Sequence, residues 1–317
     1  MSAQSRDATL FALLAAIWGG SFVAIKFVVG VVPPVFGAFL RVALALAVLA
    51  AVFKYENKDL RVPRALKRRM WLAGLFAQGL PFCFLFWGER LISPGLAGII
   101  NGTVPLWTFC LGWALGTGEA LTPRKLTGLL MGFVGIVVVC SPLLSFSGTR
   151  AEAAGTTAVF LMAVCYGVGS LLTRSLLSGH AKVDFRANAF HQTCAAAVFL
   201  LVVSGATETW PAPGVLLGAP AVVGSILYLG VVSTALAFLI YFHLIREWGA
   251  VRASAVTYVA PIVAVFWDYV FFRNVPKPAE GLGVLAILSG VALLHATTPG
   301  GSVGGGVEPN KEVAAHE

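Results

Sequence analysis

The sequence has few charged residues. Of its 317 residues, 11% are Asp, Glu, Lys or Arg, whereas 58% are hydrophobic and the mean hydropathy is +0.87. Soluble domains carry about 25% charged residues, because their surfaces face water. A chain with so little charge cannot cover its apolar surface with hydrated groups. This composition excludes a water-soluble globular fold and predicts a membrane protein.

Motifs for catalysis and metal binding are missing as well. The cysteines lie in apolar runs without C-x-x-C spacing, which disfavours a zinc site or a structural disulfide. H-E-x-x-H, G-x-S-x-G and P-loop motifs are absent, and no pair of carboxylates is clustered. Because no nucleophile, metal cage or acid–base pair is visible, we predict that the chain is not an enzyme and uses no metal or cofactor.

Long apolar runs are abundant instead. Each has a length near the roughly 20 residues that a helix needs to cross a bilayer core of about 30 Å. The sequence therefore predicts an all-α membrane protein with ten transmembrane helices, at residues 9–32, 34–53, 69–88, 95–117, 125–143, 156–177, 187–205, 220–244, 250–272 and 281–297.

The pattern of these runs is duplicated. The run G-I-I-N-G-T-V-P, which ends at Pro105, matches S-A-V-T-Y-V-A-P, which ends at Pro261, 156 positions later. Internal duplication in an apolar chain is typical of transporters with a site between two repeats. Each predicted repeat, 9–145 and 155–297, holds an odd number of spans, so the two must be inverted. We expect two inverted five-helix repeats around a central cavity, with a disordered tail at 298–317.

Polar and aromatic residues inside the spans are the candidates for substrate contacts, since the bilayer penalises polar groups that face lipid. Pro105 and Pro261 lack the N–H that would bond the carbonyl four residues earlier, so they release the carbonyls of Asn101 and Thr257. A proline kink whose carbonyl is satisfied by a neighbour is the alternative. The other residues expected to bind substrate are Trp18, Gln78, Tyr166, His243 and Tyr258.

Three charged residues also lie within predicted spans. Lys26 lies far from either end of its span and is a candidate for a charge or coupling role. Arg41 is expected either to bind a carboxylate or to extend toward the nearer headgroups. Asp268 is a candidate for carrying a coupling proton.

The basic residues are distributed unevenly. Seven of the 22 lysines and arginines lie between residues 54 and 69, and the positive-inside rule assigns this loop to the cytoplasm. With ten spans, both termini are then cytoplasmic, in a protein integral to the cytoplasmic (inner) membrane. The net charge of +8 fits anionic lipid as the counterpart, and the hydrophobicity argues against nucleic acid.

Several stretches resemble one family. A-I-W-G-G-S-F-V-A-I-K from Ala16, F-W-G-E-R-L-I-S-P-G from Phe86 and G-E-A-L-T-P-R-K-L-T-G from Gly118 are similar to the EamA family of the drug/metabolite transporter superfamily. The resemblance covers residues 10 to 297. It implies ten helices in two inverted repeats and movement of small metabolites, often export of amino acids. The second half departs from the pattern, with Arg273 and Asn274 in place of G-E.

The predicted function is secondary, ATP-independent transport that exports a small organic metabolite, such as an amino acid, by alternating access. An aromatic or bulky apolar amino acid suits the many aromatic residues of the spans. The expected partners are this small-molecule substrate and the lipid bilayer, and the protein is expected to be a monomer or a weak homodimer. The alternative is a membrane-embedded enzyme acting on a lipid or a small amphipathic substrate.

Cysteine labelling tests the predicted topology. A cysteine introduced at Ser302, in the tail, should not react with a membrane-impermeant maleimide in intact cells, and it should react once the cells are permeabilised. A cysteine at Arg150, in a loop predicted to be external, serves as the control that labels from outside. Labelling of the Ser302 position in intact cells would contradict the ten-span topology.

Overall fold

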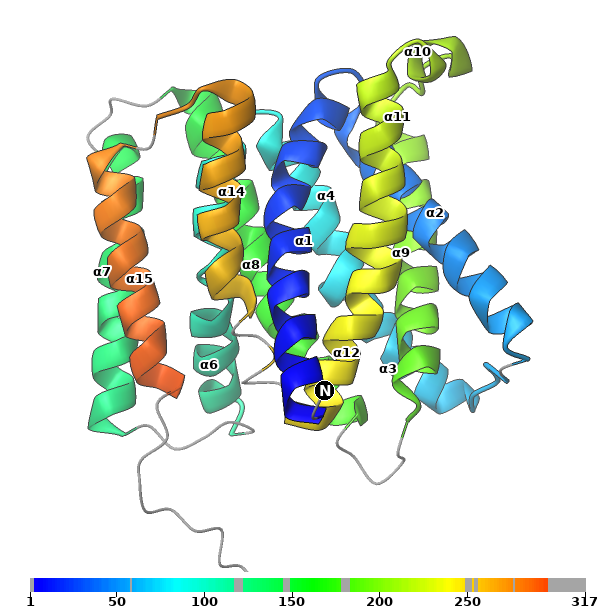
Figure 1. Ribbon diagram of the computed structural model, residues 1–317, viewed down its shortest axis with the longest axis horizontal. Coiled ribbons are helices and arrows are strands. Elements are labelled where there is room, and N and C mark those ends of the chain that lie inside the picture. Colours follow the sequence, from blue (N-terminus) through cyan, green and yellow to red (C-terminus); the bar gives the residue numbers. More distant parts are fainter. Residues whose placement is uncertain are drawn as a thin grey trace, which may run out of the picture.

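The computed structural model describes residues 3–57, 59–116, 122–144, 149–177, 183–248, 253, 256–275 and 277–295. All regular structure in these ranges is helical, as the sequence predicts (Figure 1). The predicted tail at 298–317 lies outside the described residues.

The helices follow one another with short connections. In chain order they are α1 (Ala3–Val29), α2 (Pro34–Tyr55), α3 (Arg64–Gly74), η1 (Leu75–Gly79), α4 (Leu80–Glu89), α5 (Pro94–Asn101), α6 (Val104–Ala114), α7 (Pro123–Leu144), α8 (Arg150–Leu177), α9 (Phe185–Thr207), α10 (Pro213–Leu217), α11 (Pro220–Leu227), η2 (Tyr228–Leu236), α12 (Ala237–Trp248), α14 (Val256–Phe272) and α15 (Pro278–His295).

Within the described ranges, 7 helical stretches are long and apolar enough to cross a membrane. They are Ser5–Val29, Pro34–Tyr55, Arg64–Glu89, Pro94–Ala114, Arg150–Leu177, Phe185–Thr207 and Pro220–Trp248. Shorter apolar helices at Leu126–Gly135, Val259–Phe272 and Gly281–Gly290 lie inside the remaining predicted spans.

Proline sets where many helices begin. It occupies the first position of α2, α5, α7, α10, α11 and α15. Proline suits this position because its fixed φ matches the helix and the N–H it lacks would have no partner there. The side chain of Ser93 adds a cap to α5 by accepting a hydrogen bond from the backbone N–H of Leu96, at 3.2 Å.

Two of the long stretches contain π-helical segments. In Arg64–Glu89 the segment is η1, and in Pro220–Trp248 it is η2. The wider π turn shifts the hydrogen-bond register, and the hydroxyl of Thr234 donates to the carbonyl of Leu229 at 2.7 Å. Such segments are frequent at functional sites, and η2 presents Ser233 and Thr234 toward Arg41 of α2.

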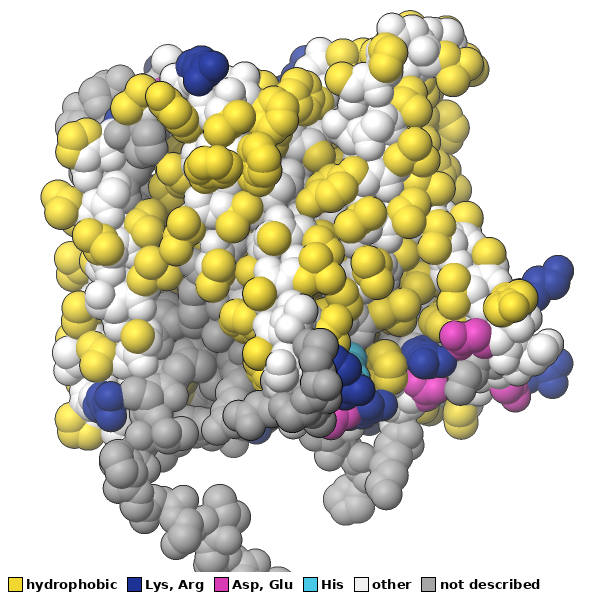
Figure 2. Space-filling model, viewed as in Figure 1, with side chains coloured by type: hydrophobic (Ala, Val, Ile, Leu, Met, Phe, Trp, Pro, Cys, Tyr) yellow, Lys and Arg dark blue, Asp and Glu magenta, His cyan; other side chains and the backbone are white. Residues whose placement is uncertain are grey.

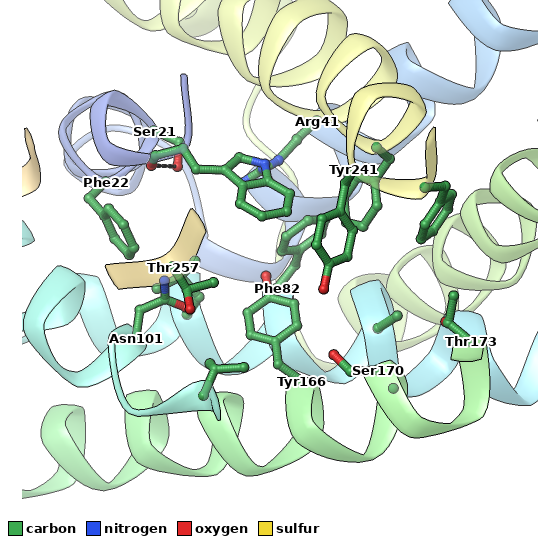
Figure 3. Close-up of a pocket in the computed structure, with 17 residues that line it drawn as sticks. Ser21, Phe22, Arg41, Phe82, Asn101, Tyr166, Ser170, Thr173, Tyr241 and Thr257 are labelled. Atoms are coloured by element: carbon green, nitrogen blue, oxygen red, sulfur yellow. Dashed lines mark hydrogen bonds between the residues drawn. The ribbon is translucent and has the colours of Figure 1, made fainter. Parts of the chain in front are cut away.

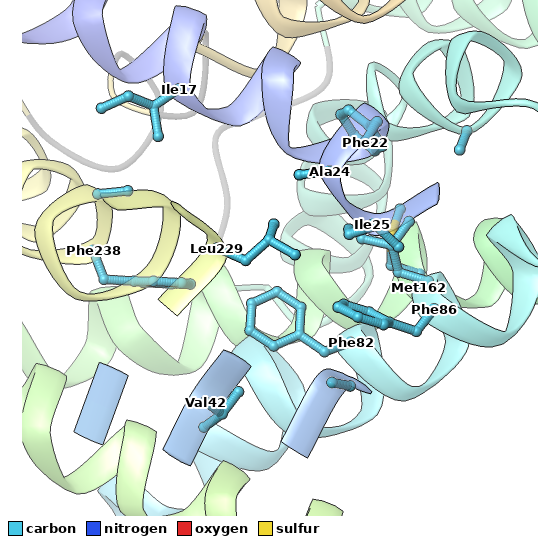
Figure 4. Close-up of a cluster of buried hydrophobic side chains, with 14 of the residues drawn as sticks. Ile17, Phe22, Ala24, Ile25, Val42, Phe82, Phe86, Met162, Leu229 and Phe238 are labelled. Atoms are coloured by element: carbon cyan, nitrogen blue, oxygen red, sulfur yellow. The ribbon is translucent and has the colours of Figure 1, made fainter. Parts of the chain in front are cut away.

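The largest buried cluster joins helices from both halves of the chain. Phe22 and Ile25 of α1, Phe82 and Phe86 of α4, and Phe238 of α12 belong to it (Figure 4). Helices α7 and α15 pack against each other at one side of the bundle (Figure 1).

The outer surface matches a protein that faces lipid. In Figure 2, hydrophobic side chains cover most of the visible face, while charged side chains gather along its lower edge. The N-terminus and the end of α12 lie at this same edge (Figure 1). The band of hydrophobic surface is therefore bounded at one end by a charged rim.

The crossing of α5 and α14 depends on glycine. A Cβ atom added to Gly98 would lie 2.5 Å from the Cβ of Ala264, and one added to Gly102 would lie 3.0 Å from Cγ of Pro261. Small residues let helix backbones approach closely inside a membrane, where the hydrophobic effect does not drive association.

Replacing Gly98 should therefore destabilise the bundle. We expect Gly98→Ala to cost about 1–3 kcal/mol of unfolding free energy, because the added methyl group overlaps α14. Gly224→Ala is the matched control, since nothing lies within 4 Å of a Cβ at that position of α11. Thermal unfolding in detergent measures both variants, and equal melting temperatures would contradict the tight crossing.

Candidate functional site

A cavity of about 70 Å³ lies inside the bundle, where helices from the two halves of the chain meet (Figure 3). Its lining comes from α1, α2, η1, α4, α5, α6, α8, α12 and α14. The residues are Trp18, Ser21, Phe22, Arg41, Ala77, Phe82, Leu85, Asn101, Val104, Tyr166, Gly169, Ser170, Thr173, Phe238, Tyr241, Phe242 and Thr257.

Aromatic rings form much of the wall. The ring of Trp18 packs at 5.1 Å from Tyr241 and 5.9 Å from Phe238, measured between ring centroids. Tyr166 points into the cavity from α8 (Figure 3). A cavity with this wall suits an apolar or aromatic ligand group.

Polar groups occupy separate places on the wall. Asn101 of α5 and Thr257 of α14 lie beside each other at one end of the cavity, and Tyr241 faces Ser170 of α8 at another place (Figure 3). The Asn101 side chain has no hydrogen-bond partner among the described residues. Its amide is free to bind a polar group of a ligand.

Arg41 supplies the positive charge of the cavity. The side chain is 2% exposed, and its Nε donates to the hydroxyl of Thr234 at 2.7 Å. Its Nη2 donates to the carbonyl and the hydroxyl of Ser233, both at 3.2 Å. The guanidinium lies over the ring of Phe82, with Cζ 4.1 Å from the centroid.

The partners of Arg41 leave its charge without a counter-ion. They are neutral oxygens and an aromatic face, and no carboxylate of the described residues lies within 4 Å. Among those residues Nη1 also has no hydrogen-bond partner. A buried guanidinium with spare donors is well suited to bind a carboxylate.

The cavity brings together five of the residues predicted from the sequence. Trp18, Arg41, Asn101, Tyr166 and Thr257 all line it. Arg41 therefore does not extend to the headgroups, because its donors are held by η2.

Gln78 and His243 lie elsewhere. The side-chain oxygen of Gln78 accepts a hydrogen bond from Thr193 of α9 at 3.3 Å, and this holds the amide away from the cavity. His243 lies 3.2 Å from the carboxylate of Asp7 and 3.4 Å from Arg246, near the charged rim. Neither residue contacts the cavity, so we leave both out of the site.

The two prolines differ in position. Pro261 is inside α14, whereas Pro105 is in the first turn of α6. The span that we expected to bend at Pro105 is instead broken into two helices, between Asn101 and Val104. Both prolines lie outside the cavity lining, whereas Asn101 and Thr257, four residues before them, belong to it. Tyr258 belongs to α14, but its side chain lies outside the described residues.

Lys26 and Asp268 form a separate polar group near one end of the bundle. The ammonium of Lys26 donates to the carbonyls of Glu89 and Ile92 at 2.6 and 2.7 Å. One carboxylate oxygen of Asp268 accepts from the backbone N–H of Gly95 at 3.0 Å, and the other accepts from Asn274 at 2.9 Å. A glutamate at position 274 would place a second carboxylate beside Asp268, whereas the asparagine present donates to it.

Several lining residues were missed from the sequence. Ser21 follows Trp18 at a spacing of three, and Ser170 and Thr173 follow Tyr166 at four and seven. These spacings put each set on one helix face. The helical spacing from Tyr166 could therefore have identified Ser170 and Thr173 from the sequence. Nothing in the sequence distinguishes Tyr241 from the other aromatic residues of its span. Among the described residues no cluster of His, Cys, Asp and Glu could hold a metal ion.

The apolar helices, 7 of which are long enough to cross a membrane within the described ranges, indicate an integral, multi-pass membrane protein. Comparison with protein families agrees, since the EamA-like transporter family matches residues 7–141 and again 153–296. The chain belongs to the EamA-like transporter family, within the drug/metabolite transporter superfamily.

Individual relatives are similar over most of their length. A "Probable terminal-alkyne amino-acid exporter" of Streptantibioticus cattleyicolor is 25% identical, covering 81% of this chain and 83% of its own. A "Probable amino-acid metabolite efflux pump" of Escherichia coli is 24% identical, and the match covers 90% of this chain and 93% of that protein. One solved crystal structure has a TM-score of 0.64 at 22% identity and covers 92% of this chain and 96% of its own, which shows a shared fold.

The two prolines can be compared by substitution. Pro261→Ala supplies the backbone N–H that the proline lacks inside α14, and we expect it to remove most transport while the protein still reaches the membrane. Pro105→Ala is the matched control, because a proline in the first turn of a helix replaces an N–H that would have no partner. Abundance and transport are measured on the same membranes. Full transport by Pro261→Ala at normal abundance would contradict a role for Pro261 in transport.

Proposed function

We propose that the protein is a secondary transporter that exports an amino acid with an aromatic or bulky apolar side chain across the cytoplasmic membrane. Alternating access is achieved by movement of two inverted five-helix repeats around the cavity. The observation that carries the substrate assignment is the buried guanidinium of Arg41, which has no carboxylate within 4 Å among the described residues.

Contacts between helices support the two repeats. At an offset of 148 residues α1 corresponds to α8, and at 156 residues the α5–α6 pair corresponds to α14. In the structure α1 packs against α14, and α8 packs against α5 and α6. Each half therefore places its first span against the fourth span of the other half, as a two-fold related pair would. The π segments also correspond, since a shift of 156 residues puts η1 within η2.

The lining supports an amphipathic substrate. Arg41 would bind the carboxylate with its free donors, and Asn101 and Thr257 would bind a polar group at the other end of the cavity. Trp18, Tyr166, Tyr241 and Phe238 would contact an apolar side chain. The names of the relatives from Streptantibioticus and Escherichia coli, which refer to amino-acid export, point to the same substrate class.

The position of the charges supports the proposed orientation. The charged rim lies at the N-terminal end of α1 and at the end of α12 (Figures 1 and 2). Under the positive-inside rule this edge faces the cytoplasm. The group formed by Lys26, Glu89 and Asp268 then lies toward the external side.

A pair of ligands tests the role of Arg41. We expect Arg41→Gln to weaken L-phenylalanine binding by roughly ten- to a hundredfold, because a hydrogen bond to a charged group contributes about 1.5–3 kcal/mol. Phenethylamine, which has the same ring and amine but no carboxylate, should bind the variant and the wild type equally well. Isothermal titration calorimetry on purified protein measures both ligands.

Arg246→Gln is the control for loss of a positive charge, since Arg246 is exposed on α12 and pairs with Glu247. It should leave both affinities unchanged. Wild-type affinity of Arg41→Gln for L-phenylalanine would contradict the proposal, and so would an equal loss for both ligands.

A further inference from the structure

Glu89 is a buried carboxyl group outside the cavity. It is the last residue of α4, and its side chain is 0% exposed. Neither carboxyl oxygen has a hydrogen-bond partner among the described residues. The neighbouring Asp268, in contrast, has a donor on each oxygen. Two acidic side chains in the same region therefore have different surroundings.

A cation lies close to Glu89 without pairing with it. The ammonium of Lys26 is 2.6 Å from the backbone carbonyl of Glu89, and a second bond goes to the carbonyl of Ile92. These contacts place the ammonium at the carbonyl end of α4, where the helix dipole attracts positive charge. Because Lys26 already touches the backbone of Glu89, a pairing with its carboxylate needs side-chain rotation and little movement of α1.

The charged groups that act on Glu89 come from three helices. They are Lys26 of α1, Arg41 of α2 and Asp268 of α14. Helix α8 presents Gly155, Ala158 and Val159 to the adjacent Gly88, and neither η1 nor α5 contains a charged residue. The field at Glu89 is thus set by two cations and one anion.

This environment suits the neutral form of the carboxyl. A buried carboxylate is costly unless donors or a paired cation replace the water it has lost, and Glu89 has neither in this arrangement. When the helices around it move and Lys26 or water reaches it, the charged form becomes favourable. One side chain then alternates between two charge states as the bundle changes shape.

We propose that Glu89 is a proton-binding site whose charge changes during the transport cycle and couples transport to a proton gradient. In the arrangement seen here the carboxyl holds the proton. In another arrangement of the bundle it releases that proton to water, and the carboxylate pairs with Lys26. Glu89 is an ion site separate from the proposed substrate site in the cavity. Of the two tests below, only the flux measurement rests on the proposed function, because it uses the proposed substrate.

Infrared spectroscopy tests the protonation without any substrate. Purified wild-type protein at neutral pH should show a carboxylic-acid C=O band that shifts in deuterated water and is absent from Glu89→Gln. Glu152→Gln is the matched control, because Glu152 is exposed at the start of α8, where it accepts from the N–H of Thr149 at 2.8 Å. It should keep the band. Absence of the band from wild-type protein would overturn the proposal, even if Glu89→Gln failed to fold.

Flux of L-phenylalanine in proteoliposomes tests the coupling. An imposed pH gradient should change the initial rate severalfold for the wild type and for Glu152→Gln. Glu89→Gln should exchange internal for external L-phenylalanine but should not respond to the gradient. A response of Glu89→Gln equal to that of the wild type would overturn the proposal, as would a wild type that ignores the gradient. If no protein moves L-phenylalanine, the proposed substrate is wrong, and the infrared result still decides the protonation of Glu89.

Discussion

Water is absent from the centre of a bilayer, so each charged or hydrogen-bonding group there must be satisfied by the protein or by a ligand. Arg41 meets this constraint only in part. Its Nε and Nη2 bond to Thr234 and Ser233, and its face lies on Phe82, but its charge has no counter-ion among the described residues. Because this charge is only partly satisfied, we propose that the cavity binds an anionic group of the substrate.

The same constraint explains the irregular helices. A π segment or a helix break exposes backbone groups, and these are tolerated where they face protein or a cavity. In this structure η2 holds the donors of Arg41 in place, and the break after Asn101 lies at the cavity end formed by α5 and α14. The close crossing at Gly98 and Gly102 brings Thr257 to the same end. The irregular backbone segments therefore lie at the proposed substrate site.

The two buried polar groups have related roles in this account. In the proposed function Arg41 binds the charged end of the substrate, and the proposed proton site at Glu89 lies at the end of α4. When Glu89 holds a proton, the field at Arg41 is more positive than when Glu89 is a carboxylate. A change of charge at Glu89 is therefore felt in the cavity without direct contact, which provides a physical link between proton binding and substrate binding.

Much of the fold could be predicted from the sequence, because apolar length and proline position are local signals. Among the described residues, 7 of the predicted runs overlap helical stretches long and apolar enough to cross a membrane, and the family was identified from stretches such as A-I-W-G-G-S-F. The site was predicted less completely. Trp18, Arg41, Asn101, Tyr166 and Thr257 were found because they are polar or aromatic within apolar spans.

The sequence could not show which polar side chains face the cavity, because composition does not contain the rotation and packing of the helices. Gln78 and His243 have the same chemistry as true lining residues, but their helices turn them toward Thr193 and Asp7. Glu89 stands beside Arg90 just after a predicted span, and only the packing of α4 against α8 shows that it is buried. The rotation of each helix and its tertiary packing determine the surroundings of these three side chains.

A structure of the protein with bound L-phenylalanine tests the central claim most directly. The account predicts the ligand in the cavity, with its carboxylate within hydrogen-bonding distance of the Arg41 guanidinium and its ring among Trp18, Tyr166 and Tyr241. A ligand whose carboxylate binds elsewhere, with Arg41 still bonded only to Ser233 and Thr234, would contradict it.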